Sequence, residues 1–223
     1  MKKSNENGFT VVEILCVIGI MAGLLGLIFP VFAKARIRAK SASCMANVRS
    51  VGLSSLIYCG DNDDRFPFGT DDWSKTFSFL HGTDSSLVQS LPLYTELLRP
   101  YVKGQQVFKS PLDIGMSVTD FGGMRYERKP SLYDAVGSSY LYFVPAGLKL
   151  SGSSEYLSNL PIFMSAAGHW QCGCRAMVYG ETTPENDPTK NTGYRYSVSF
   201  GDGHAKTLSY EQWNQISQSK APP

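Results

Sequence analysis

Residues 9–33 read FTVVEILCVIGIMAGLLGLIFPVFA, and this stretch decides how the rest of the chain is arranged. The run is about 25 residues long, and about 20 apolar residues suffice for a helix to cross a bilayer. Its only charged side chain is Glu13. A carboxylate inside a membrane costs roughly 2.5–3.5 kcal/mol at the centre and less near an end, so such a group suggests a function. The stretch therefore predicts a membrane helix with one functional acid near its start.

A polar leader, residues 1–8 (MKKSNENG), precedes this run. Because positive residues tend to stay in the cytoplasm, its lysines predict a single-pass inner-membrane protein whose C-terminal part lies in the periplasm. Two simpler explanations compete. A secretory signal could be cleaved after Ala35, although its apolar core is usually only roughly 7–15 residues long. An unprocessed signal anchor is the other.

The residues around Glu13 carry a family resemblance. The sequence from Gly8 to Glu13, GFTVVE, resembles the processing site of type IV pilins and of the pseudopilins of type II secretion. The resemblance implies that a prepilin peptidase cuts after Gly8 and that the new terminal residue, Phe9, is N-methylated. Pro30 also stands where many members have a proline. It implies a filament of identical or related pilins at the cell surface or in the periplasm, assembled on an inner-membrane platform.

Cleavage after Gly8 would leave a free α-amino group on Phe9, with a reference pKa of roughly 7.7–8. That cation needs an anion in a membrane, because an unpaired charge in a low dielectric is costly. We predict that Glu13 of one subunit pairs with Phe9 of a neighbour and so sets the axial stagger of the filament.

The helix is predicted to continue to residue 60. Apolar residues recur at helical spacing after residue 44, which is typical of a helix with one buried face, and Gly60 is a stop signal. This stripe contains Met45, Val48, Val51, Gly52, Leu56, Tyr58 and Cys59. Lys34, Arg36, Arg38 and Lys40 directly follow the apolar run; they would contact headgroups or neighbouring subunits, or form a solvated basic face.

Residues 40–67 resemble, more narrowly, a bacterial group of pilin-like proteins with a C-terminal Asp-Gly-His motif. The matching positions are Cys44, residues 47–52, Tyr58, Asp61, Asp63, Phe66 and Pro67. Residues 97–102 and 107–113 resemble the central pattern of that group, with Ser110 in place of its usual cysteine. Asp202-Gly203-His204 matches the terminal motif, but Thr192 stands where the group has a histidine.

The remaining chain favours an α+β fold, a long N-terminal helix packed on a small, mostly antiparallel sheet. The expected parts are a leader (1–8), a transmembrane helix and filament core (9–33), a soluble half-helix (34–60) and a globular domain (61–223). Residues 69–90 and 115–138 are expected to be irregular, and 93–102 a short helix. Period-two patterns predict strands at 139–144, 160–164, 175–179, 194–200 and 204–208. Residues 201–203 should turn a hairpin, and Ser209 and Gln212 should cap a last helix.

Candidate sites for other chemistry are few. Cys59 could form a disulfide with Cys172 or Cys174, or all could be free thiols. Asp61, Asp63 and Asp64 suggest calcium, but the sixth and twelfth positions of such a loop are Phe66 and Asp72, so a polar helix stop is favoured. Asp202 and His204 could contribute to a polar cluster or a metal site, although a tight hairpin turn is the favoured explanation.

The expected function is that of a structural subunit, without catalytic residues and without a cofactor. A net charge of +2 does not favour nucleic acid binding, and no phosphate-binding or nucleophile motif is present. The alternative is a filament-displayed adhesin or glycan-binding module that binds sugars with exposed aromatic residues such as Trp73, Trp170 and Tyr133. A secreted hydrolase behind a signal peptide is a third class.

Overall fold

The computed structural model describes residues 10–76, 85–121, 124–128, 130–144, 148–150, 153–172 and 193–218. The expected cleavage site at Gly8 and Phe9, the expected strand 175–179, and Cys174 lie outside these residues. The chain divides into two compact units, Met1–Ala39 and Lys40–Pro223, which are described separately.

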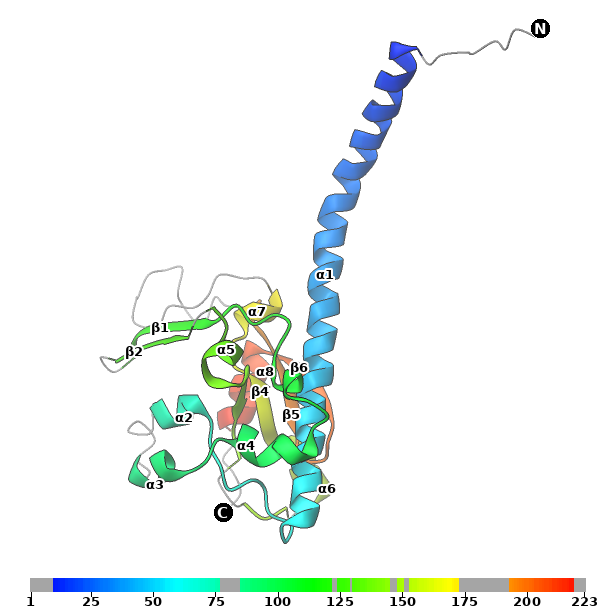
Figure 1. Ribbon diagram of the computed structural model, residues 1–223. Coiled ribbons are helices and arrows are strands. Elements are labelled where there is room, and N and C mark those ends of the chain that lie inside the picture. The colour runs from blue at the N-terminus through cyan, green and yellow to red at the C-terminus, as the bar shows by residue number, and fades with distance from the viewer. Residues whose placement is uncertain are drawn as a thin grey trace, which may run out of the picture. The chain divides into compact units, whose positions relative to one another are not determined.

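One long helix, α1 (Val11–Asp61), carries the apolar run and the predicted amphipathic half (Figure 1). In the first unit its large apolar side chains are exposed along the run from Val11 to Phe32. The helix is long and apolar enough to cross a membrane. Its end at Asp61 agrees with the predicted end at residue 60.

The second unit is built on a four-stranded antiparallel sheet in the order β3-β4-β5-β6. Its strands are β3 (Tyr140–Tyr142), β4 (Pro161–Ser165), β5 (Arg195–Phe200) and β6 (Ala205–Ser209). Consecutive strands are neighbours, so the sheet is a simple meander. Four of the five strand predictions are confirmed to within a few residues. The arrangement is α+β, as predicted.

One face of the sheet packs against the second half of α1. Val48, Val51 and Cys59 of the helix are fully buried. A Cβ atom at Gly52 would lie only 2.8 Å from Cβ of Ser199 on β5, so the helix and the strand approach too closely for any side chain at position 52. Ser197 and Ser199 of β5, which alternate with Tyr196, Val198 and Phe200, therefore face the helix.

The other face of the sheet is covered by α8 (Tyr210–Gln218), whose Trp213 and Ile216 pack against Tyr196, Val198 and Leu208. The predicted capping box is confirmed, because Ser209 N donates to Gln212 Oε1 at 3.0 Å and Gln212 N to Ser209 Oγ at 3.3 Å. The sheet is thus buried on both faces.

Two segments expected to be irregular contain regular structure. Residues 69–90 contain the helices α2 (Asp72–Thr76) and α3 (Ser85–Ser90). Residues 115–138 form the hairpin β1 (Met116–Phe121) and β2 (Met124–Arg128), followed by α5 (Leu132–Val136). Local composition is misleading here because distant groups help to hold these elements. Asp113 Oδ1 and Oδ2 accept the N–H groups of Leu132 and Tyr133, each at 2.9 Å, at the start of α5.

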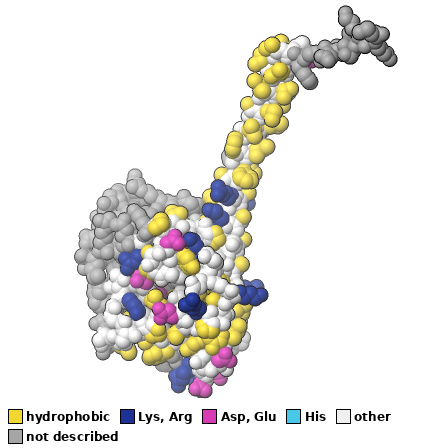
Figure 2. All heavy atoms as spheres, viewed as in Figure 1, with side chains coloured by type: hydrophobic (Ala, Val, Ile, Leu, Met, Phe, Trp, Pro, Cys, Tyr) yellow, Lys and Arg dark blue, Asp and Glu magenta, His cyan; other side chains and the backbone are white. Residues whose placement is uncertain are grey.

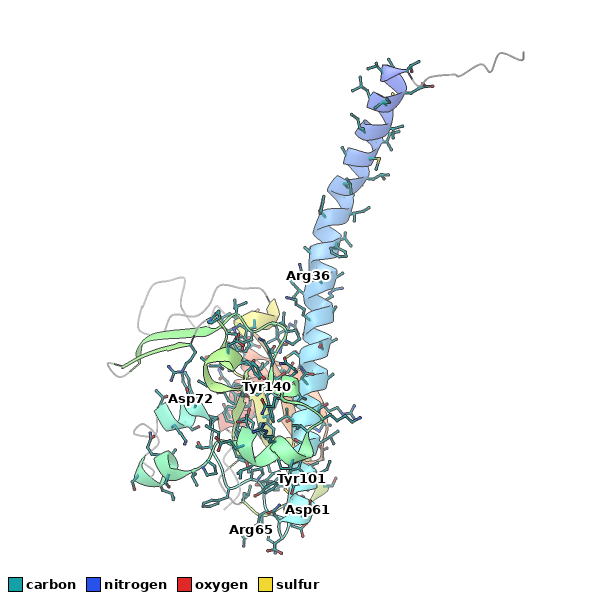
Figure 3. All side chains as sticks on the ribbon, viewed as in Figure 1. Arg36, Asp61, Arg65, Asp72, Tyr101 and Tyr140 are labelled. Carbon is teal, nitrogen blue, oxygen red and sulfur yellow. The ribbon has the colours of Figure 1, made fainter. Side chains whose placement is uncertain are left out.

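The predicted helix at 93–102 is confirmed as α4 (Tyr94–Leu98), continued by the 3-10 helix η2 (Arg99–Tyr101). The short elements η3 (Gln105–Phe108), α6 (Ser154–Asn159) and α7 (His169–Cys172) complete the described part. Tyr94, Tyr140 and Phe163 are buried in the main core beside α1, and Tyr140 is labelled in Figure 3.

Candidate functional site

The first turn of α1 contains the one acidic side chain of the apolar run. Thr10 N and Thr10 Oγ1 each donate a hydrogen bond of 2.8 Å to Glu13 Oε2. In return, Glu13 N donates to Thr10 Oγ1 at 3.3 Å. This reciprocal arrangement is a capping box, which satisfies backbone N–H groups that the helix itself cannot pair at its start.

From the sequence, Glu13 was predicted only to be a charge that awaits a neighbouring subunit, and this local role was missed. The signal was present, because Thr-x-x-Glu before an apolar run is a capping-box pattern. Among the described residues both donors use Oε2. Oε1 is therefore able to accept a hydrogen bond from a further donor, such as an amino group of another chain. Glu13 itself is exposed.

The apolar run is helical throughout, including the backbone at Pro30. Proline removes one helical hydrogen bond, so the turn before it is the least strongly held part of the run. Cβ atoms placed on Gly19, Gly23 and Gly26 would meet nothing within 4 Å. The flanks of the helix at these glycines are therefore open to close approach by another helix.

Basic residues also follow the apolar run, and they bear on the orientation of the helix in a membrane. Lys34, Arg36 and Arg38 are exposed on α1, and Figure 2 shows dark-blue lysine and arginine side chains where the apolar surface ends. The leader contributes only Lys2 and Lys3. Counted over both flanks, the positive-inside tendency therefore favours the orientation opposite to the one inferred from the leader alone.

The Asp-Gly-His motif forms the turn between β5 and β6. Asp202 Oδ1 accepts from the backbone N of His204 at 3.0 Å and lies 2.6 Å from His204 Nδ1. The His204 ring stacks on Phe200 with centroids 4.3 Å apart. Partial burial opposes ionisation of Asp202, but these hydrogen bonds lower its pKa below the ordinary value. Gly203 has a φ of 88°, which the turn requires. Both polar side chains are thus engaged in the turn geometry itself.

The acidic run after α1 forms a helix stop. Asp63 and Asp64 adopt left-handed backbone conformations, and Asp64 N donates to Cys59 O at 3.0 Å. Asn62 Nδ2 donates to Tyr58 O at 2.9 Å and so closes the last turn. Within the described residues, no three His, Cys, Asp or Glu side chains are placed together where they could hold a metal ion.

The described cysteines Cys16, Cys44 and Cys59 are free thiols. Burial raises the pKa of Cys59 to about 11, with a further contribution from the Asp64 carboxylate. Burial also raises the pKa of Cys44, whose thiol lies 3.9 Å from the Tyr140 hydroxyl, and the nearby Ser110 hydroxyl opposes that change. Cys174 and the side chain of Cys172 lie outside the part of the chain that the structure describes.

The aromatic residues considered for glycan binding do not form one exposed platform. Trp170 is buried, and its Nε1 donates to Gly115 O at 3.1 Å, so the expectation that it is exposed is wrong. Trp73 packs against the same core cluster as Trp170. Tyr133 lies under the Lys109 ammonium group, 5.1 Å from the ring centre.

A buried acid, Asp71, lines a pocket between α2, α4 and β3. Its carboxylate accepts the backbone N–H groups of Ser74 at 2.6 Å and of Tyr142 at 2.7 Å. Burial raises the pKa of Asp71, and these two hydrogen bonds oppose that change. Because both oxygens accept backbone donors, Asp71 joins α2 to the sheet. This role of Asp71 was not predicted from the sequence.

Comparisons of this chain with protein-family models, with curated proteins and with solved structures found no match.

Proposed function

We propose that this chain is a structural subunit of a type IV pilus-like or type II pseudopilus filament, processed after Gly8 and methylated at Phe9. The observation that carries the proposal is an apolar run, residues 9–33, whose described large side chains are exposed and whose only acid, Glu13, lies in the first turn of α1 with Oε1 available to a second donor. The resemblance of GFTVVE to prepilin processing sites supports the other parts of the proposal, which are cleavage, methylation and assembly into a filament. Partners in this proposal are copies of the chain or related pilins, a prepilin peptidase and an inner-membrane assembly platform.

Assembly would change the surroundings of Glu13. In a single chain the carboxylate accepts hydrogen bonds from Thr10. In a filament, the amino group of a neighbouring Phe9 would bind the same carboxylate, and this ion pair would be strong in a medium of low dielectric. The capping box would hold the acid in place before the neighbour arrives, which lowers the cost of ordering it.

Two substitutions separate the charge from the cap. Glu13→Gln retains a side chain that can close the capping box but removes the charge. Thr10→Val removes the cap but retains the charge. If the ion pair drives assembly, Glu13→Gln subunits remain in the membrane as unassembled protein, whereas Thr10→Val subunits still enter filaments. The opposite result would leave Glu13 with a capping role alone.

Processing is tested by mass spectrometry of the mature N-terminus from the native membrane. The proposal expects an N-methylated Phe9. A chain that begins at Arg36 would instead support a secretory signal cleaved after Ala35, and an intact Met1 would support an unprocessed anchor. Orientation is tested by an enzyme reporter fused to the C-terminus that is active only in the periplasm, where we place the globular domain on the strength of the family resemblance.

A further inference from the structure

Three basic side chains of the first unit lie where the apolar surface of α1 ends. Lys34, Arg36 and Arg38 are all exposed, and they follow Val31 and Phe32, which are exposed apolar residues. Figure 2 shows basic side chains where the apolar surface of the helix ends, and Arg36 is labelled in Figure 3. The change from apolar to basic surface takes place within a few residues. Such an abrupt change is typical of a helix that passes from hydrocarbon into an interface.

The three side chains surround the helix. Successive residues of an α-helix are rotated by about 100°, so Lys34 and Arg38 lie on one side and Arg36 lies nearly opposite. A contact with one protein surface would need basic residues on a single side. A planar interface that encloses the helix can be contacted from all sides, and this is the geometry that the three residues match.

Their distance from the start of the helix agrees with the thickness of a bilayer. At about 1.5 Å per residue, Lys34 lies about 36 Å along the axis from Thr10, and Arg38 about 42 Å. The hydrocarbon core is about 30 Å thick, and about 40–45 Å with the headgroups. If Thr10 lies at one interface, the three residues are at the headgroups of the other.

The charge of these residues is not neutralised within the described part of the chain. From Ile14 to Gly60 the sequence contains no Asp or Glu. None of the ion pairs found among the described residues includes Lys34, Arg36 or Arg38. Three cations at this depth therefore need anions from beyond the residues that the structure describes.

We propose that Lys34, Arg36 and Arg38 bind the phosphate groups of anionic lipids at the membrane surface where α1 emerges. The inference rests on the proposed membrane insertion of α1. A basic residue close to an anionic membrane surface strengthens binding by about fivefold, and the effect decreases as salt screens the charges. Bound lipid would fix the depth of the helix, and with it the height of Glu13, before a subunit enters a filament.

The test uses the full-length chain reconstituted in phosphatidylcholine vesicles with or without phosphatidylglycerol. Electron spin resonance of spin-labelled lipids measures how strongly each lipid associates with the protein. The test variant is K34Q/R36Q/R38Q, in which glutamine keeps a similar helix propensity. The matched control is R99Q/K103Q/K149Q, which removes three exposed basic residues of the second unit. Extraction at alkaline pH reports separately whether each protein is inserted.

We expect the wild-type chain and the control to prefer phosphatidylglycerol by about fivefold or more, with a smaller preference at high salt. The triple variant should lose that preference and remain inserted. Equal association of the two lipids with the inserted wild-type chain would overturn the inference, as would an unchanged preference in the variant. Salt-sensitive self-association without lipid preference, abolished in the variant, would assign these residues to a protein contact. A wild-type chain extracted at alkaline pH would instead contradict the proposed function.

Discussion

Ser197 and Ser199 lie on the same face of β5, and the structure treats their hydroxyls differently. Ser197 Oγ accepts a hydrogen bond of 2.7 Å from Gln171 Nε2. Ser199 Oγ is buried and has no hydrogen-bond partner among the described residues. A buried polar group without a partner costs roughly 1–3 kcal/mol. Ser199→Ala should therefore raise the free energy of unfolding by about 1 kcal/mol, measured by denaturant titration in detergent and followed by tryptophan fluorescence.

Ser197→Ala is the matched control for this prediction. Like Ser199→Ala, it removes one hydroxyl group from the same face of β5. Unlike Ser199→Ala, it takes away a hydrogen-bond acceptor of Gln171, so the free energy of unfolding should fall by about 1–2 kcal/mol. If the two alanine variants were equally destabilised, Ser199 would have a partner that this structure does not show.

The buried thiol of Cys59 predicts a pH dependence. Its ordinary pKa is 9.0 and its folded-state pKa is about 11, so the folded chain holds this proton more tightly than the unfolded chain. The contribution of this proton to the stability of the fold is complete below pH 9. It is lost as pH rises from 9 to 11, by at most about 1.4 kcal/mol per pH unit. In denaturant titrations between pH 9 and 11, the free energy of unfolding of Cys59→Ala should therefore fall less steeply with pH than that of the wild type.

Buried tyrosines also lower stability at high pH, and those remote from Cys59 cancel in the comparison. Burial, together with charge on Cys59, raises the pKa of Tyr58 and of Tyr142, so the clearest comparison is below the ordinary tyrosine pKa of 10.0. Cys16→Ala, in the first unit, should retain the wild-type slope. Equal slopes for wild type and Cys59→Ala would show that the thiol does not titrate differently on unfolding.

Among the elements, the contact between α1 and β5 depends on a residue without a side chain. A Cβ atom on Gly52 would lie 2.9 Å from Ser199 Oγ as well as close to its Cβ. Gly52→Ala should separate the helix from the sheet and cost about 1–3 kcal/mol of unfolding free energy, measured as above. Gly60→Ala is the control, since its Cβ would meet nothing within 4 Å and alanine favours a helix by up to about 1 kcal/mol. If Gly52→Ala left the free energy of unfolding unchanged, α1 and β5 would be able to move apart without a loss of stability.

The link between α1 and the segment after η3 offers a second test. Cys44 and Ser110 are both buried, and the Ser110 hydroxyl lies close enough to the Cys44 thiol to oppose the effect of burial on its pKa. Ser110→Cys should form a disulfide with Cys44 under oxidising conditions and stabilise the second unit by about 2–4 kcal/mol, because the bridge restricts the unfolded chain. Thiol titration and the mass of the oxidised protein measure the bridge. The double variant C44A/S110C should form none, and a thiol count that does not fall by two on oxidation of Ser110→Cys would show that the side chains cannot reach bonding geometry.

For the molecule as a whole, the two units differ in how they satisfy their apolar surface. The second unit buries its own core, whereas the large apolar side chains from Val11 to Phe32 are exposed. A chain that begins at Lys40 should therefore remain soluble without detergent, while the full chain should sediment unless detergent or lipid covers the run. Analytical ultracentrifugation compares them, and a truncated chain that aggregates would show that the second unit depends on the first.

The sequence alone determined the apolar helix, most of the four-stranded sheet and the turn at Asp202. These features depend on neighbouring residues: the length of an apolar run, the alternation along a strand, and glycine at a position of positive φ. The capping box of Thr10 and Glu13 was also legible in the sequence, although the acid was first interpreted only through its charge.

Only the tertiary structure decided the rest. The elements within residues 69–90 and 115–138 are supported by Asp71, which joins α2 to Tyr142 on β3, and by Asp113, which binds the start of α5. The burial of Trp170 and the close approach of Gly52 to Ser199 likewise join residues far apart in the chain. A local pattern cannot predict such contacts, because their free energy comes from groups that meet only after the chain has folded.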